Sequence, residues 1–304
     1  MRKVKFKNRN WDTAANLHLP DNFDETQNYP AIVCVHPGGS VKEQTAGLYA
    51  RELAKKGVIA LAYDASFQGE SGGEPRYLED PTTRVEDIRY AVDYLITLNF
   101  VDENRIGLLG ICAGGGYAAN AALKERRIRA VAMVSGVNIG RAFREANFLE
   151  ILEAVSSQLT AEVNGAELTV TNWTPNSSEE AKKAGINDLD MLEAINYYRT
   201  PRGEFPTSNN KLLFASMPNL IMFDAFHLAD LLLTQPLLII VGDKVGAFGS
   251  YRDGFDLYKK AASKNKKIHI VSGASHYDLY DKPEATAGAL DKLVPFFRKN
   301  LLQE

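Results

Sequence analysis

Residues 106–124 read IGLLGICAGGGYAANAALK, which joins an apolar strand-like run, a glycine-rich turn and a small-residue helix in direct succession. The turn has the pattern Gly-X-Cys-X-Gly, with Cys112 at its centre. A sharp strand-to-helix turn requires glycine near its central residue, because a side chain there would collide with neighbouring backbone. The pattern therefore predicts a nucleophile elbow that pushes the Cys112 side chain out above a sheet.

Segments on both sides of this turn alternate between continuous apolar runs and amphipathic helical patterns. Such alternation indicates an α/β fold, a mostly parallel sheet with helices on both of its faces. Two short strands are expected before the alternation begins. The predicted strands are residues 4–8, 16–20, 31–36, 57–64, 106–111, 128–135, 236–243 and 267–273.

The alternation stops near Gly136 and resumes only at Pro236. We therefore expect residues 1–136 and 232–304 to form the α/β core, and residues 137–231 to form a mainly helical cap inserted into it. Within this insertion, Ser177 and Glu180 have the spacing of a capping box, which predicts the start of a helix.

Composition narrows the class of partner. The 304 residues are 45% hydrophobic and carry a formal net charge of -3, with both signs spread along the chain. This gives no electrostatic footprint for nucleic acid or an anionic membrane, so a small-molecule partner is expected. The basic start MRKVKFKN leads into no continuous apolar segment, which favours a cytoplasmic location. Two cysteines, Cys34 and Cys112, are expected to be free thiols.

The position of Cys112 bears on its reactivity. At a helix N-terminus the macrodipole and the free backbone N–H groups favour thiolate over thiol, so the elbow is expected to activate the sulfur. The structural alternative is a small buried cysteine beside a packing turn. A second alternative takes residues 114–119, GGGYAA, as a dinucleotide loop. That interpretation lacks the acidic residue expected about 20 residues further on.

Acyl transfer also requires donors for a developing oxyanion. In an elbow architecture one donor is the amide of the residue after the nucleophile, here Ala113. The other is expected from the loop HPGGS at 36–40, through the amide of Gly38 or Gly39. The alternative for this loop is an ordinary tight turn. His36 itself is expected to shape the loop rather than to act as a base.

Of the five histidines, His276 is the candidate general base. It follows the last predicted strand in a loop, and the order nucleophile, acid, histidine is the one that an elbow-type hydrolase uses. The acid is less well marked, because the common G-x-x-D pattern read from Gly242 places Val245 where aspartate is expected. Asp243 is the nearest carboxylate and our candidate, with Asp253, Asp256 and Asp278 as substitutes.

Several motifs together resemble the dienelactone-hydrolase-like branch of the α/β-hydrolases, and within it the polyketide-transferase-like proteins. They are HPGG (36–39), AYDASFQGESGGEPRYLEDP (62–81), FVDENRIGLLGICAGGGYAANAA (100–122), YYRTPRG (197–203) and GASHYDLYD (273–281). The resemblance covers most of the chain. It implies an α/β-hydrolase fold, a Cys-His-Asp triad that maps onto Cys112, His276 and an aspartate, and no cofactor or metal.

We therefore expect a hydrolase of ester or thioester bonds that forms a covalent acyl-cysteine. A thioester intermediate also reacts with amines and thiols, so an acyltransferase with the same intermediate is an alternative. A third possibility is a non-catalytic relative that only binds a ligand. It stays open because Val245 stands where an aspartate is expected.

Overall fold

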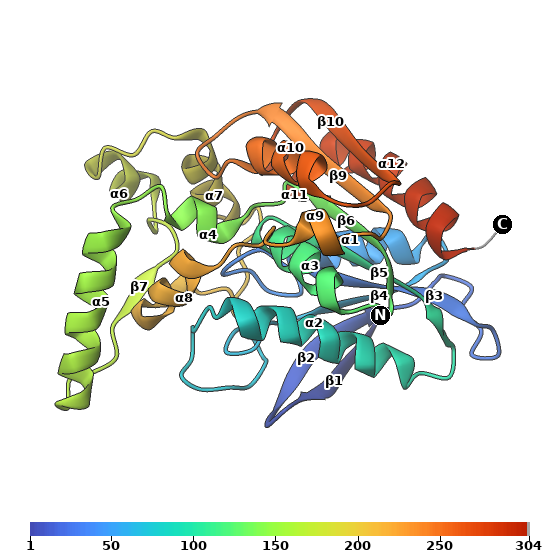
Figure 1. Cartoon of the computed structure of the whole chain (residues 1–304), viewed down its shortest axis with the longest axis horizontal. Helices are drawn as coiled ribbons and strands as arrows, with labels where there is room; N and C mark the ends of the chain where they lie inside the picture. The colour runs from blue at the N-terminus through green and yellow to red at the C-terminus, as the bar shows by residue number, and fades with distance from the viewer. Residues whose placement is uncertain (303–304) are drawn as a thin grey trace.

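The computed structural model describes residues 1–302 and is built around one eight-stranded sheet, with strand order β1-β2-β4-β3-β5-β6-β9-β10 (Figure 1). Strand β2 runs antiparallel to both β1 and β4, and every other neighbouring pair is parallel. The strands are β1 (Arg2–Asn8), β2 (Trp11–His18), β3 (Tyr29–Val35), β4 (Ile59–Tyr63), β5 (Val101–Ile111), β6 (Ile128–Val134), β9 (Leu237–Lys244) and β10 (Lys266–Ser275).

The central strands are buried on both faces, which explains their continuous apolar sequences. Because side chains alternate across a strand, Val33 belongs to one core cluster while its neighbours Ile32 and Cys34 belong to the other. The helices of the core are α1 (Thr45–Ala54), α2 (Pro81–Ile96), α3 (Ala113–Lys124), α10 (Ser250–Lys260), α11 (Asp278–Asp281) and α12 (Pro283–Leu301). The predicted α/β fold is thus confirmed.

The segment between β6 and β9 contributes none of the eight strands of the sheet. It contains α4 (Ile139–Phe143), α5 (Phe148–Val163), β7 (Val170–Asn172), α6 (Ser178–Lys183), α7 (Leu189–Tyr198), β8 (Lys211–Leu213), a 3-10 turn (Phe214–Ser216), α8 (Met217–Met222) and α9 (Ala229–Leu232). Strands β7 and β8 pair antiparallel, which periodicity did not predict. The predicted start of α6 is confirmed, since the Ser177 hydroxyl accepts from the Glu180 amide at 3.2 Å. The capping box itself is not closed, because the Glu180 carboxylate accepts from the Asn176 amide at 2.7 Å rather than from the Ser177 amide.

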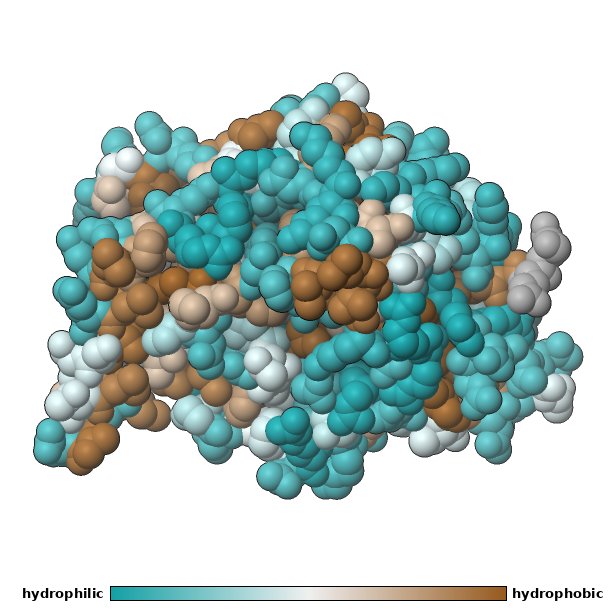
Figure 2. Space-filling model, viewed as in Figure 1, coloured by the Kyte–Doolittle hydropathy of each residue, from teal (hydrophilic) through white to brown (hydrophobic). Residues whose placement is uncertain are grey.

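Helix α5 extends along one side of the molecule, at the left of Figure 1, and Val155 is its only buried residue. Figure 2 shows apolar side chains along this helix within a largely polar face. Leu159 and Val163 are among its exposed apolar residues. Within residues 1–302 no helix combines the length and the apolar character that crossing a membrane requires.

Candidate active site

The turn between β5 and α3 has the sharp geometry that its glycines predict. Cys112 adopts φ 54° and ψ -126°, a conformation rarely seen outside glycine, and forms the N-cap of α3. A Cβ atom on Gly110 would overlap the Gly114 carbonyl, and one on Gly114 would overlap the Val35 carbonyl. Only glycine fits either position, so these residues hold Cys112 at the end of the sheet.

Cys112 lines a pocket of about 340 Å³ whose walls come from both the sheet loops and the β6–β9 segment. Apolar side chains form most of the wall, and no lining side chain belongs to the acidic or basic residues Asp, Glu, Lys, Arg or His. The polar lining groups are hydroxyls and amides. They belong to Thr174, Tyr198, Ser208, Asn210, Tyr277 and Tyr280. Such a pocket suits an uncharged, largely apolar group.

The loop expected to supply an oxyanion donor lies at this pocket, because Gly38 and Gly39 line it together with Ala113. An interaction of the Ala113 amide with the Cys112 sulfur lowers the pKa of the thiol. His36 is fully buried behind the loop. Its Nε2 accepts from the Ala65 amide at 3.0 Å, so Nδ1 carries the proton and donates to the Pro37 carbonyl at 2.6 Å. His36 therefore shapes the loop, as the sequence predicts.

Trp173 of the β6–β9 segment lies directly on this loop. A Cβ atom on Gly38 would lie 2.9 Å from Trp173 Cη2, and one on Gly39 would lie 2.8 Å from Trp173 Nε1. Gly39 also has a φ of 68°. The two glycines are therefore required by the approach of the indole ring as well as by the turn.

His276 follows β10 and is 2% exposed. Its Nε2 lies 3.2 Å from the Tyr280 hydroxyl, and an interaction of that hydroxyl with the Cys112 sulfur lowers the pKa of the thiol. Tyr280 thus contacts both the candidate nucleophile and the candidate base.

Burial sets the protonation states of this pair. It raises the pKa of the Cys112 thiol to about 11, although hydrogen bonds from Tyr280 and Ala113 lower it. It lowers the pKa of His276 to about 3. The resting pair is therefore a thiol and a neutral imidazole, not the thiolate expected from the helix N-terminus. Desolvation outweighs the favourable effect of the helix at this position.

Asp243, the acid predicted from sequence, is not brought to His276. It lies within β9 and is exposed, and its carboxylate accepts from the Gly273 amide at 2.6 Å and the Ser272 hydroxyl at 3.2 Å. Within residues 1–302, His276 Nδ1 is buried and has no hydrogen-bond partner.

The substitute aspartates are engaged elsewhere. Asp253 accepts two hydrogen bonds from Arg141, at 2.9 and 2.6 Å. Asp278 pairs with Lys282 at 2.5 Å. Asp256 is exposed on α10. None of them meets the free nitrogen of His276, since that atom has no partner among the described residues.

One buried carboxylate near the pocket belongs to no sequence motif and could not be predicted from one. Asp190 in the first turn of α7 is 1% exposed, and its Oδ2 accepts from the Phe248 amide at 2.9 Å. Burial, together with the nearby charges of Asp188 and Glu193, raises its pKa to about 7, although the hydrogen bond from the Phe248 amide lowers it. Its Oδ1 has no hydrogen-bond partner among residues 1–302.

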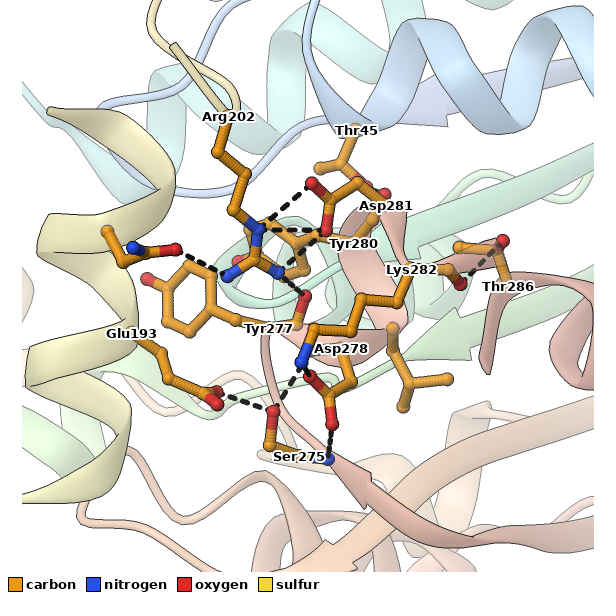
Figure 3. A network of polar contacts seen from close by, with 12 residues as sticks. Thr45, Glu193, Arg202, Ser275, Tyr277, Asp278, Tyr280, Asp281, Lys282 and Thr286 are labelled. Carbon is orange, nitrogen blue, oxygen red and sulfur yellow. Dashed lines mark hydrogen bonds and ion pairs between the residues drawn. The ribbon is translucent and has the colours of Figure 1, made fainter. Parts of the chain in front are cut away.

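Polar contacts attach α7 and the turn that follows it to the segment around His276 (Figure 3). Glu193 accepts from the Ser275 hydroxyl at 2.5 Å. Arg202 pairs with Asp281 at 2.7 Å and donates to the Tyr277 carbonyl at 2.8 Å. The β6–β9 segment is therefore joined to the histidine loop by hydrogen bonds as well as by packing.

Comparison with known proteins agrees with this fold. The model of the alpha/beta hydrolase family matches residues 32–289. The uncharacterized protein YcjY of Escherichia coli strain K12 is 45% identical over 310 residues, 98% of this chain and 99% of its own. The crystal structure of the hypothetical protein PA2218 from Pseudomonas aeruginosa matches with a TM-score of 0.87 at 30% identity, covering 99% of this chain and 93% of that one.

Two further relatives bear functional names. The thiohydrolase aneE of Aspergillus aculeatus is 34% identical over 56% of this chain and 54% of its own. The polyketide transferase claH of Penicillium crustosum is 25% identical over 89% of this chain and 88% of its own. These relatives agree with the resemblance that the motifs carry. The chain belongs to the alpha/beta hydrolase family.

Proposed function

We propose that this chain hydrolyses ester or thioester bonds through a covalent acyl-cysteine on Cys112. The observation that carries the proposal is the placement of Cys112 on a strained elbow, at the wall of an uncharged pocket that the glycine loop also lines. Strain at one non-glycine residue persists where the surrounding structure enforces it, which is common at catalytic nucleophiles. The name of the relative aneE, a thiohydrolase, supports thioesters as substrates.

The reaction starts from the neutral pair. The Cys112 sulfur attacks the substrate carbonyl while His276 takes the thiol proton, with the Tyr280 hydroxyl in contact with both groups. The amides of Ala113 and of Gly38 or Gly39 hold the oxyanion. His276 then protonates the leaving group, and water activated by the same imidazole releases the acid.

The segment at residues 137–231 acts in this proposal as the cap that selects the acyl group. It contributes apolar side chains such as Ile139, Phe143 and Met191 to the pocket wall. Because that wall holds no acidic or basic side chain, the acyl part of the substrate is uncharged.

Acyl transfer is the second candidate function. The apolar pocket favours it, since a dry site protects a thioester from water until an acceptor arrives. The relative claH, named a polyketide transferase, points the same way. Partition of a preformed acyl-enzyme between water and an added thiol or alcohol separates the two reactions, because a transferase consumes the acceptor in preference to water.

The test compares the two cysteines. Cys112→Ala is expected to abolish turnover of aryl esters and acyl thioesters and to remove the acyl adduct from the intact-protein mass spectrum. Cys34→Ala is the matched control, because Cys34 is a fully buried thiol on β3 outside the pocket, and it should keep both. Unchanged turnover in Cys112→Ala would contradict the proposal. The third possibility, a relative that only binds a ligand, would then be favoured.

A further inference from the structure

We propose that Asp190, carried by α7 of the β6–β9 segment, supplies the carboxylate that orients His276 and balances its charge during the reaction. The inference rests on the proposed function of Cys112 and His276. The sequence pattern expects the acid of the triad in the loop after β9, whereas this proposal assigns it to α7.

The first observation is the space that Asp190 fills. The loop after β9 offers Val245, which is 61% exposed, and Gly246. A Cβ atom on Gly246 would lie 2.5 and 2.6 Å from the two carboxylate oxygens of Asp190. The Asp190 carboxylate thus occupies the position that a side chain of this loop would take. The absence of a side chain at Gly246 is what admits it.

The second observation is a pair of unused atoms. His276 Nε2 faces Tyr280, so the ring accepts the thiol proton there only if Nδ1 already carries a hydrogen. Within the described chain, both His276 Nδ1 and Asp190 Oδ1 are buried without a hydrogen-bond partner. The two atoms are not hydrogen-bonded to each other, and because buried polar atoms usually have partners, each of them calls for an explanation.

The two side chains also meet the same residue. The Phe248 amide donates to Asp190 Oδ2 at 2.9 Å. The Phe248 ring stands edge-on to the His276 ring, with centroids 5.5 Å apart and planes at 87°. Phe248 therefore lies against both the carboxylate and the imidazole.

The third observation is the orientation of α7. Asp190, Glu193 and Tyr197 lie at positions i, i+3 and i+7, which share one face of a helix. Glu193 bonds the Ser275 hydroxyl, as Figure 3 shows, and the Tyr197 ring lies 5.1 Å from the Tyr280 ring. This face of α7 therefore contacts residues on both sides of His276.

The chemistry requires such a group. When a sulfur lone pair of Cys112 forms the C–S bond, the carbonyl electron pair moves to oxygen and the thiol proton moves to His276 Nε2. The ring then carries a proton on both nitrogens and a positive charge in a buried site. An ionised Asp190 accepts from Nδ1–H and compensates that charge. The proton later leaves with the expelled group, so Asp190 gains and loses nothing over the cycle.

The first test is Asp190→Asn, which keeps the shape and an acceptor for the Phe248 amide. We expect kcat for an activated ester to fall by at least about 100-fold with little change in KM, as loss of an orienting carboxylate does in other triads.

The groups around Asp190 are Asp188 and Glu193 on its own helix, the Phe248 amide, and Cys112 and Tyr277 at the pocket. The wild-type rate should rise with pH as Asp190 ionises near its pKa of about 7, and the variant should lack this limb.

Stability separates orientation from folding. The folded-state pKa of Asp190 is raised above its ordinary value, so the folded state favours the protonated carboxyl. The contribution of this group to the free energy of unfolding is complete below about pH 4 and is lost as the pH rises through about 7. Asparagine removes this cost. Asp190→Asn is therefore expected to melt at the same temperature as wild type or higher at pH 8, while its kcat falls as stated above.

The second test relocates the carboxylate. Gly246→Asp alone places a side chain against Asp190 and should reduce activity, whereas Asp190→Gly with Gly246→Asp frees that space and should recover at least tenfold over Asp190→Gly. The inference is overturned if Asp190→Asn keeps kcat within threefold, or loses activity through KM alone with an unchanged pH profile. In that case Cys112→Ala still decides the proposed function separately.

Discussion

The Tyr280 hydroxyl hydrogen-bonds His276 Nε2 at 3.2 Å and also interacts with the Cys112 sulfur. The phenol of Tyr280 therefore lies between the Cys112 thiol and the His276 imidazole, which a simple triad would join by a direct hydrogen bond. Its bond to sulfur lowers the thiol pKa, so it partly offsets the effect of burial. Tyr280 is itself fully buried and packs on Tyr277 with ring centroids 4.5 Å apart, which fixes the position of the hydroxyl.

Tyr280→Phe is expected to raise the thiol pKa further and to lower the rate of acyl-enzyme formation roughly tenfold, the scale of one hydrogen bond to a charged group. Stopped-flow measurement of the acylation burst checks this. Tyr63→Phe is the control, because the Tyr63 hydroxyl is buried without a partner in residues 1–302 and outside the pocket. Equal burst rates in both variants would contradict a role for Tyr280.

The thiol pKa gives a second prediction. Burial raises the pKa of Cys112 to about 11, so the thiolate fraction near pH 7 is lower than that of a free cysteine. Iodoacetamide should therefore label Cys112 more slowly than it labels a small thiol at pH 7.5, and the rate should keep rising beyond pH 9. Cys34→Ala provides the background for this measurement, since Cys34 is fully buried. A labelling profile that levels off below pH 8 would show a thiolate-imidazolium pair at rest.

The contact between the β6–β9 segment and the glycine loop can be tested by a double-mutant cycle. Gly38→Ala puts a methyl group 2.9 Å from Trp173 Cη2, and the resulting shift of the loop should lower kcat. Adding Trp173→Leu frees the space and should restore part of the loss, which gives a favourable coupling between the two changes. Losses that simply add would mean that the alanine acts through the backbone alone. Circular dichroism on each variant confirms that the fold is kept.

The sequence predicted the parts of this site that obey local rules. The glycines at 110 and 114 predict the elbow, because any other residue would place a Cβ atom against neighbouring backbone. The continuous apolar runs predict the buried parallel strands. Asp190 has no such signal. It reads as an ordinary acidic residue in the first turn of a helix, a position that the helix dipole favours anyway. Its proximity to Gly246 depends on how an irregular insertion folds back onto the sheet, which periodicity does not encode.

The same reasoning explains why the sequence predicts Asp243 as the acid. Strand ends in a parallel sheet gather functional side chains, and Asp243 is the carboxylate nearest to the expected position. The strand, however, continues through Lys244, and the Asp243 carboxylate binds the Gly273 amide of β10. One more residue of strand is enough to change which group a side chain meets, because alternate residues face opposite ways.

The last prediction concerns Arg84, a buried arginine behind the glycine loop. Its Nη2 donates to the His36 carbonyl at 2.6 Å, and its Nη1 lies 3.6 Å from the fully buried carboxylate of Glu79. Arg84→Met leaves Glu79 without its cation and should destabilise the fold by about 3–5 kcal/mol, the usual cost of breaking a buried pair from one side. Urea unfolding at pH 8 measures the loss.

Adding Glu79→Gln to Arg84→Met should recover most of that stability, because an amide needs no counter-charge and still reaches the Tyr117 hydroxyl that Glu79 now contacts at 2.8 Å. Activity should not recover in the double variant. The His36 carbonyl has then lost its donor, and the loop that presents Gly38 and Gly39 to the pocket is no longer fixed from behind. Recovery of stability and activity together would instead assign Arg84 to the charge balance of the core alone.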